Sequence, residues 1–132
     1  MKKEIEINSK IESISIVENL IDEMSIELAL VADIYGNVLI GVIEAVTNAI
    51  VHGNKLEESK VVKISMVSSK QFVSVRISDE GVGFNYEDIP DPTKPNNVEK
   101  PDGRGVFLMK HLADEVTFEK GGSVVNLKFK VV

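Results

Sequence analysis

The 132-residue sequence contains no cysteine, only two histidines and only two arginines. Without cysteine the chain can form neither disulfides nor thiolate metal sites, and thiol catalysis is excluded as well. Two histidines alone argue against a structural zinc site. A nucleic-acid-binding domain normally presents a basic stripe with arginine side chains, whereas this chain carries a net charge of −6 and only Arg76 and Arg104 as arginines. We therefore expect no direct contact with nucleic acid.

Long hydrophobic segments are also missing. The first ten residues, MKKEIEINSK, lack the apolar core of a signal peptide, and no apolar run approaches 18 residues. The length fits a single domain over residues 1–132, and the content of 43% hydrophobic and 27% charged residues is typical of a soluble globular domain. We expect a cytoplasmic protein that makes no contact with a membrane.

Alternating and helical patterns predict the order of the elements along the chain. The predicted elements are a strand over 3–7, a helix that begins at a capping box of Ser9 and Glu12, a helix over about 33–52 that ends at Gly53-Asn54, strands over 60–67 and 71–78, a helix from Gly105 to about Glu115, and strands over 116–119 and 123–131. Residues 85–102 contain all four prolines, and a loop of this length in a compact domain is commonly a functional lid. This order predicts an α+β fold, a two-layer sandwich whose helices cover one face of a mixed, mostly antiparallel sheet.

The helix over 33–52 carries the first candidate site. Asn37, Gly41, Glu44, Asn48 and His52 fall on the side opposite the apolar stripe, and they are poorer helix formers than the residues usual on a solvated face. Glu44 and Asn48 are four residues apart and therefore neighbours. A carboxylate can take a proton from a hydroxyl, and an amide oxygen can bind Mg²⁺. A solvated helix face with a chance asparagine is the alternative.

Two further segments suggest contacts with a ligand. Asp79-Glu80-Gly81-Val82-Gly83 directly follows the strand over 71–78, so an ionised Asp79 could accept a hydrogen bond from an exocyclic amine, such as that of adenine. An ordinary turn is the alternative there. Gly103-Arg104-Gly105 precedes a predicted helix, whose free N–H groups suit phosphate. A flexible hinge at a helix start is the alternative for this segment.

The order of the three segments is more specific than any one of them. EAVTNAIVHGN (44–54), DEGVGF (79–84) and DGRGVFLMKHLADEV (102–116) resemble the three conserved boxes of the ATPase superfamily of gyrase, heat-shock chaperone, histidine kinase and MutL proteins. Within that superfamily the chain is most similar to the small bacterial anti-sigma factor serine kinases. The P-loop and the signatures of ordinary protein kinases are absent from the sequence.

This resemblance implies a Bergerat ATP-binding fold that takes ATP or ADP with Mg²⁺. It implies Glu44 as the general base, Asn48 as the Mg²⁺ ligand and Asp79 as the adenine-binding residue. The other nucleotide-binding residues implied by the resemblance are Gly81, Gly83, Lys94, Gly103, Arg104, Gly105 and Val106, with residues 85–102 as the lid.

The resemblance also implies partners. Members of this family phosphorylate a serine on an anti-anti-sigma (STAS-type) protein, sequester a sigma factor and form homodimers. One departure concerns docking, because the first helix of the family usually carries a basic residue, whereas residues 10–24 offer only Lys10. This departure leaves the identity of the partner open. Two alternatives to the kinase also stay open: a nucleotide-dependent binding module without kinase activity, against which the presence of both Glu44 and Asn48 argues, and a stand-alone ATPase whose nucleophile is water.

Overall fold

The computed structural model describes residues 1–83 and 101–131, with the backbone alone at 101–104. The helices and strands are β1 (Lys2–Asn8), α1 (Ile14–Leu28), α2 (Ala32–Asn48), β2 (Val61–Ser68), β3 (Phe72–Ser78), α3 (Pro101–Leu112), β4 (Glu115–Glu119) and β5 (Val124–Lys130). The shorter helical turns are η1 (Ile11–Ser13), η2 (Ala49–Gly53) and η5 (Lys120–Gly122). The predicted lid over residues 85–102 and Lys94 within it fall largely or wholly outside the described residues.

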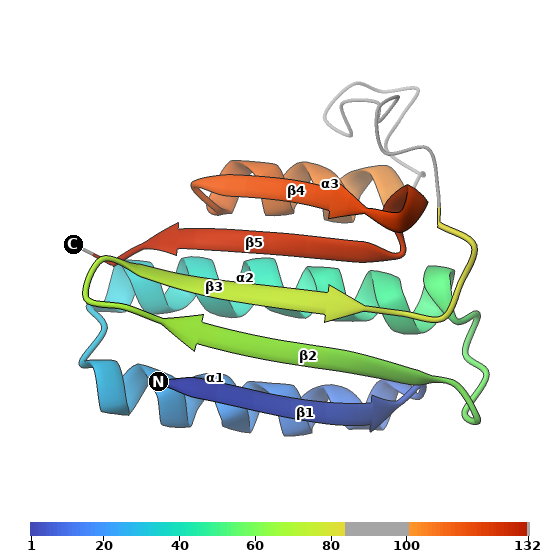
Figure 1. The fold of residues 1–132 in the computed structure, drawn as a ribbon, viewed down its shortest axis with the longest axis horizontal. Helices are drawn as coiled ribbons and strands as arrows, with labels where there is room; N and C mark the ends of the chain where they lie inside the picture. Colours follow the sequence, from blue (N-terminus) through green and yellow to red (C-terminus); the bar gives the residue numbers. More distant parts are fainter. Residues whose placement is uncertain (84–100, 132) are drawn as a thin grey trace.

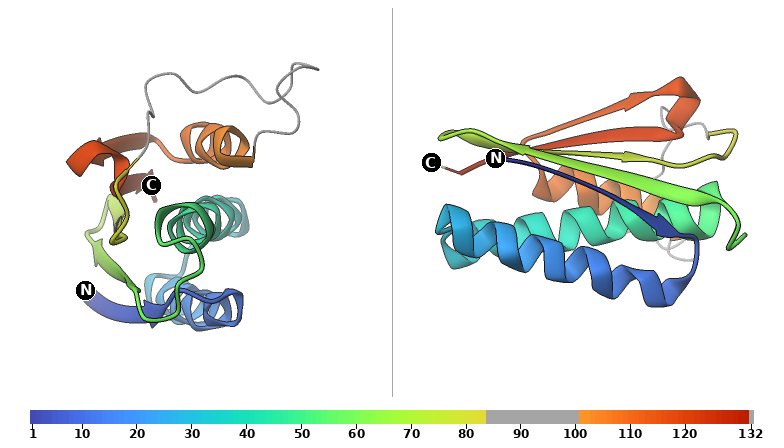
Figure 2. Two further views of the ribbon diagram at one scale, coloured as in Figure 1. Left: turned by 90° about the vertical axis from the view of Figure 1, so that its right-hand side faces the viewer. Right: turned by 60° about the horizontal axis from the view of Figure 1, so that its bottom comes forward.

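The five strands form one sheet in the order β1-β2-β3-β5-β4, and α1, α2 and α3 cover one of its faces (Figures 1 and 2). This arrangement confirms the predicted two-layer α+β sandwich. Every neighbouring pair is antiparallel, so the described sheet is antiparallel rather than mixed. β4 runs in the same direction as β3, but the hairpin between β4 and β5 inserts β5 between them.

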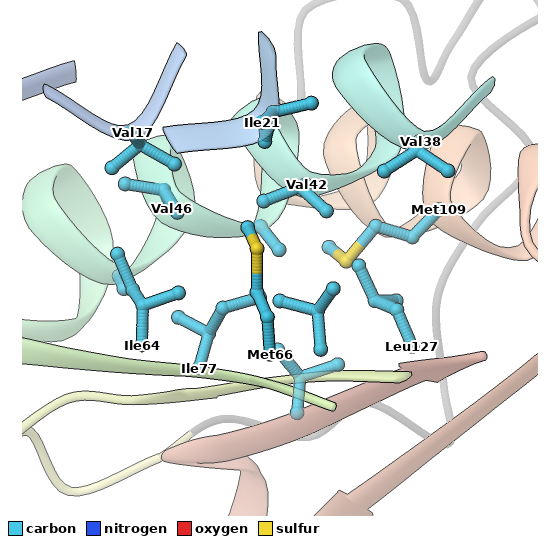
Figure 3. Close-up of a cluster of buried hydrophobic side chains, with 14 of the residues drawn as sticks. Val17, Ile21, Val38, Val42, Val46, Ile64, Met66, Ile77, Met109 and Leu127 are labelled. Carbon is cyan, nitrogen blue, oxygen red and sulfur yellow. The ribbon is translucent and has the colours of Figure 1, made fainter. Parts of the chain in front are cut away.

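The core lies between the sheet and the helices because the strands alternate apolar and polar side chains. In β3, for example, Val73, Val75 and Ile77 are buried while Arg76 is exposed and pairs with Glu119 on the open face. In the close-up of Figure 3, labelled side chains of α1, α2 and α3 meet those of β2, β3 and β5 in this layer. Its fully buried members include Val17, Ile21, Met24, Val38, Val42, Val46, Ile64, Met66, Ile77, Met109 and Leu127.

Helix α2 lies between α1 and α3 and is therefore covered on more sides than its apolar stripe predicts (Figure 2). Gly41, expected on the polar side, is buried: a Cβ there would lie 3.1 Å from the ring atom Cζ of Phe129. The prediction for Gly41 was wrong because the missing side chain lets the Phe129 ring of β5 pack against the helix backbone.

The helix over Ala32–Gly53 is long and apolar enough to span a membrane by length and composition, with a mean hydropathy of 1.6 over its most apolar window. The expectation that no apolar stretch comes near this length therefore needs correction. A core helix of a soluble protein passes the same test, and Val38, Val42 and Val46 of this helix are completely buried in the core.

The capping box predicted at Ser9 and Glu12 is absent. The Ser9 side chain is fully buried, and its hydroxyl donates to the Lys60 carbonyl oxygen over 2.7 Å instead of capping the helix. Lys10 occupies the cap position of η1 and makes no side-chain capping bond. Ser9 therefore ties the end of β1 to the segment before β2.

The predicted helix end at Gly53-Asn54 also differs in detail. The last turn, η2, is a π-helix closed by a hydrogen bond of 2.8 Å from the Asn54 N–H to the Ala49 carbonyl oxygen. The left-handed residues that end the helix are Lys55 (φ 53°) and Leu56 (φ 60°) rather than the glycine. π-Helical turns of this kind are frequent at functional sites.

Candidate functional site

A hollow of about 170 Å³ opens where α2 and η2 meet the end of β3, the second turn of α3 and the β4–β5 connection. For scale, a closed cavity of about 150 Å³ in another protein binds benzene, so this hollow suits one flat ring system. Its lining residues are Ala45, Asn48, Ala49, His52, Gly53, Lys55, Ile77, Asp79, Gly83, Val106, Met109, Phe118, Gly122, Ser123 and Val125. Of the residues predicted from the sequence, Asn48, Asp79, Gly83 and Val106 are brought together on its wall.

Asp79 is the acidic residue among the lining side chains. Its Oδ1 accepts a hydrogen bond of 2.7 Å from the Gly81 N–H, while its own N–H donates to the Ser123 carbonyl oxygen. Within the described residues Oδ2 receives no hydrogen bond, and this oxygen lies on the side of Gly53. Burial raises the pKa of the Asp79 carboxyl above its ordinary value, and the hydrogen bond from Gly81 offsets part of the rise.

The raised pKa of Asp79 predicts a pH dependence of stability. Between the ordinary carboxyl pKa of about 3.9 and the raised value, the folded protein holds more protons than the unfolded chain. The contribution of Asp79 is therefore present at low pH and is lost as pH rises through the raised pKa. Asp79→Asn has no carboxyl group to ionise, so its stability should not fall over this pH range. We therefore expect it to melt at a higher temperature than wild type near neutral pH. Equal melting temperatures for both proteins at every pH would contradict the prediction.

Two glycines make room for the Asp79 carboxylate. A Cβ on Gly53 would lie 2.5 Å from Asp79 Cγ, and a Cβ on Gly81 would lie 2.8 Å from the carbonyl carbon of Gly53. Both distances are too short for any side chain, so the π-helical turn and the turn after β3 can meet only through glycines. Gly81 thus lies between the Gly53 backbone and the Asp79 carboxylate, and it does not line the hollow itself.

Gly53→Ala is expected to displace the Asp79 carboxylate and to weaken binding of an adenine nucleotide by an order of magnitude, because a methyl group cannot share this space. Gly36→Ala is the matched control, since a Cβ at Gly36 meets nothing within 4 Å and alanine in a helix is favoured by about 0.5–1 kcal/mol. Calorimetric titration of both variants measures the difference. Unchanged affinity in Gly53→Ala would contradict the close fit.

Asn48 lies on the α2 wall of the hollow, opposite the second turn of α3. A Cβ on Gly105 would lie 2.6 Å from Asn48 Nδ2, so glycine lets the α3 backbone approach the amide directly. Val106, the next residue of α3, is completely buried and lines the hollow from the α3 side. Glu44 is half-buried one turn before Asn48, but it does not line the hollow. The structure thus separates Glu44 from the residues that surround the hollow itself.

Helix α3 begins at Pro101, earlier than the predicted start at Gly105. Gly103 and Arg104 therefore lie within its first turn instead of before it. A proline is well tolerated at a first helical position, which explains the earlier start. The first four N–H groups of a helix have no partner within the helix, so the backbone of Gly103 and Arg104 keeps the N–H groups that suit an anion.

The described side chains offer few ligands for a metal ion. Among the side chains that the structure describes, no group of three or more histidine or acidic residues could hold a metal ion. Mg²⁺ that enters with a nucleotide needs only one or two protein oxygens, because phosphates and water supply the others. The amide oxygen of Asn48 fits this role.

Sequence reasoning missed most of the wall. The apolar part comes from Ala45, Ala49, Ile77, Met109, Phe118 and Val125. Ala45 and Ala49 share one helix face with Asn48 and His52, which the sequence had placed on the polar side, so extending the helix wheel by one position would have found them. Phe118 and Val125 come from β4 and β5, and no local pattern places these strands beside α2.

The two-layer fold and the hollow at the end of β3 define a domain of the ATPase class that the three sequence segments predicted. A model of the family described as "Histidine kinase-like ATPase domain" matches residues 8–129. The chain belongs to this family.

Two relatives are both named anti-sigma F factor. The one from Geobacillus stearothermophilus is 37% identical in an alignment of 92 residues that covers 64% of this chain and 62% of that protein. The one from Bacillus cytotoxicus is 39% identical in an alignment of 91 residues that covers 64% of this chain and 61% of that protein. The chain thus spans about three-fifths of the length of the curated relatives that it matches.

A solved structure supports the fold assignment. The crystal structure of the RsbU and RsbW domains of a Mycobacterium tuberculosis protein superposes with a TM-score of 0.65 over 98% of this chain and 31% of that chain. At 12% identity this similarity establishes the fold alone.

Proposed function

We propose that the protein binds ATP in this hollow and acts as an anti-sigma factor that phosphorylates a serine on an anti-anti-sigma (STAS-type) protein. The observation that carries the proposal is the half-buried Asp79 carboxylate, whose Oδ2 is left without a described hydrogen bond at the wall of a hollow sized for one ring system. An exocyclic amine of adenine is the donor that such an oxygen needs. Membership of the histidine kinase-like ATPase family supports the choice of ATP.

The proposed roles follow the layout of the site. Asp79 accepts from the adenine amine, with Gly81 and Gly83 shaping the base pocket. Asn48 gives its amide oxygen to Mg²⁺, which supplies neutralising charge to the phosphates when bound. The α3 start holds the phosphates through the backbone N–H groups of Gly103 and Arg104, Gly105 and Val106 form the helix surface beside them, and Lys94 contributes a further cation.

Glu44 takes the proton from the substrate serine as the general base. It is half-buried on α2, one helical turn before Asn48, so its carboxylate projects from the same side of the helix as the proposed Mg²⁺ ligand. Because Glu44 does not line the base hollow, a change in it leaves the adenine contacts intact.

The proposed partners rest on the two relatives named anti-sigma F factor. Their name supports capture of a sigma factor, while homodimer formation and a cytoplasmic location are proposed from the family resemblance alone. A second candidate function is a nucleotide-dependent binding module without transfer. It is favoured by the lack of a basic residue in α1, which removes the docking contact expected for a substrate protein.

Titration of ATP and ADP into the purified protein, with and without Mg²⁺, tests the proposal first. Micromolar binding that tightens with Mg²⁺ for ATP is the expected result. Transfer of radioactive phosphate from ATP to a serine of the partner then separates the kinase from the binding module. Absence of nucleotide binding at millimolar concentration would overturn the proposal.

A further inference from the structure

A completely buried asparagine lies behind the hollow, outside every role assigned so far. Asn54 ends the π-helical turn η2 and its side chain has no exposed surface. Burying an amide is costly unless its donors and acceptor are satisfied. Both N–H donors and the carbonyl acceptor of this amide are hydrogen-bonded here, so the burial of Asn54 is fully compensated.

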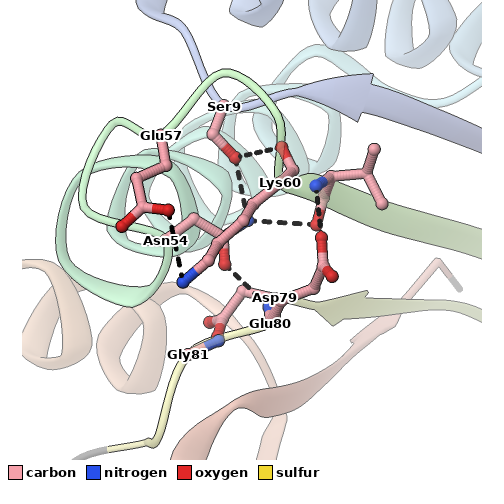
Figure 4. A network of polar contacts seen from close by, with 8 residues as sticks. Ser9, Asn54, Glu57, Lys60, Asp79, Glu80 and Gly81 are labelled. Carbon is pink, nitrogen blue, oxygen red and sulfur yellow. Dashed lines mark hydrogen bonds and ion pairs between the residues drawn. The ribbon is translucent and has the colours of Figure 1, made fainter.

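The side chain of Asn54 joins three separate segments of the chain (Figure 4). Its Nδ2 group donates to Ser9 Oγ over 2.8 Å and to the Val61 carbonyl oxygen over 3.0 Å. Its Oδ1 accepts from the Glu80 N–H over 2.7 Å. The end of β1, the start of β2 and the turn after β3 therefore meet at one amide group.

The contact with Glu80 bears directly on the ligand site. Glu80 follows Asp79, and the Glu80 carboxylate also accepts from the Val61 N–H over 2.6 Å. Two hydrogen bonds thus hold the turn that carries Asp79. Asn54 binds the backbone N–H of Glu80, and the first residue of β2, Val61, binds the Glu80 side chain. On the other side, the N–H of Asn54 closes η2, whose Gly53 borders the Asp79 carboxylate.

We infer that Asn54 is a positioning residue that fixes the direction of the Asp79 carboxylate and thereby sets the preference of the site for a base with an exocyclic amine. This inference rests on the proposed function, because it assigns Asp79 to adenine. Asn54 itself does not line the hollow and acts only through the turn that it holds.

The test compares two ligands whose bases differ at the exocyclic group and at the adjacent ring nitrogen N1, which is an N–H donor in inosine and an acceptor in adenine. Inosine triphosphate carries a carbonyl where ATP carries the exocyclic amine, so the ratio of their dissociation constants reports the direction of the Asp79 carboxylate. The variant is Asn54→Asp, which nearly keeps the shape and the acceptor for Glu80 but removes both donors. We expect its preference for ATP over inosine triphosphate to fall on the order of tenfold, because two buried acceptors lose their partner.

A merely structural role would lower the melting temperature without changing this ratio. Asn37→Asp is the matched control, since Asn37 is exposed on α2, and its ratio should equal that of wild type. A folded Asn54→Asp protein with the wild-type ratio would overturn the inference. If Asn54→Asp does not fold, Ser9→Ala decides by the same ratio, because it removes one partner of Asn54 with a small change in volume; a ratio equal to wild type would overturn the inference there too.

The wild-type protein separates this inference from the proposed function. If wild type binds neither nucleotide, or binds both equally, the assignment of Asp79 to adenine is wrong. If wild type prefers ATP and the Asn54 and Ser9 variants keep that preference, only the positioning role is wrong.

Discussion

Glu44→Ala is expected to lower phosphate transfer to the partner serine by about 10²–10⁴-fold, the usual contribution of a general base. ATP affinity should change little, because Glu44 lies outside the wall of the hollow. The two quantities separate the residue's role in transfer from any role in binding. Transfer is measured with radioactive ATP and the anti-anti-sigma protein, and affinity is measured by calorimetric titration.

Asp33→Ala is the matched control for Glu44→Ala, since it also removes a carboxylate from α2 but at the exposed first turn of the helix. This control should transfer phosphate at the wild-type rate. Wild-type transfer by Glu44→Ala would exclude Glu44 as the base. Hydrolysis by wild type at the same rate with and without the partner would instead favour a stand-alone ATPase.

Secondary structure was largely predictable from the sequence because each element depends on local spacing. The alternation in 60–67 and 71–78 agrees with β2 and β3, and the helical spacing over 33–52 agrees with α2 and η2. The errors concern residues whose partners are distant in sequence. The local sequence around Ser9 predicts a capping box, but in the structure Ser9 forms hydrogen bonds with the Lys60 carbonyl oxygen and the Asn54 side chain. The helical spacing puts Gly41 on the polar face, but the Phe129 ring packs against it.

In the candidate site, too, residues with a local motif were predictable and residues that depend on distant partners were not. Asp79 and Asn48 were found because each has a polar group and a motif around it. The need for glycine at Gly53 was not seen, because it arises from a carboxylate that lies 26 residues further along the chain. The sequence predicts Asn54 only as part of a helix end, although its hydrogen bonds join the end of β1, the start of β2 and the turn after β3.

Asp79→Asn is expected to weaken ATP binding by about 10–100-fold, which corresponds to about 1–3 kcal/mol for a buried group left facing the wrong partner. The Gly81 N–H already donates to Oδ1, so the oxygen of the new amide will keep that hydrogen bond. The amide nitrogen then takes the place of Oδ2 and points an N–H donor at the amine of adenine, which is itself a donor.

The same geometry predicts a change of preference rather than a general loss. Inosine triphosphate presents a carbonyl acceptor at that position, so Asp79→Asn should bind it at least as tightly as wild type does while losing ATP. Because the variant removes a carboxylate whose pKa burial raises, it should also be no less stable than wild type near neutral pH. Calorimetric titration of both nucleotides, with a melting curve for each protein, measures these effects together. Equal losses for ATP and inosine triphosphate would mean that Asp79 supports the shape of the pocket without facing the base.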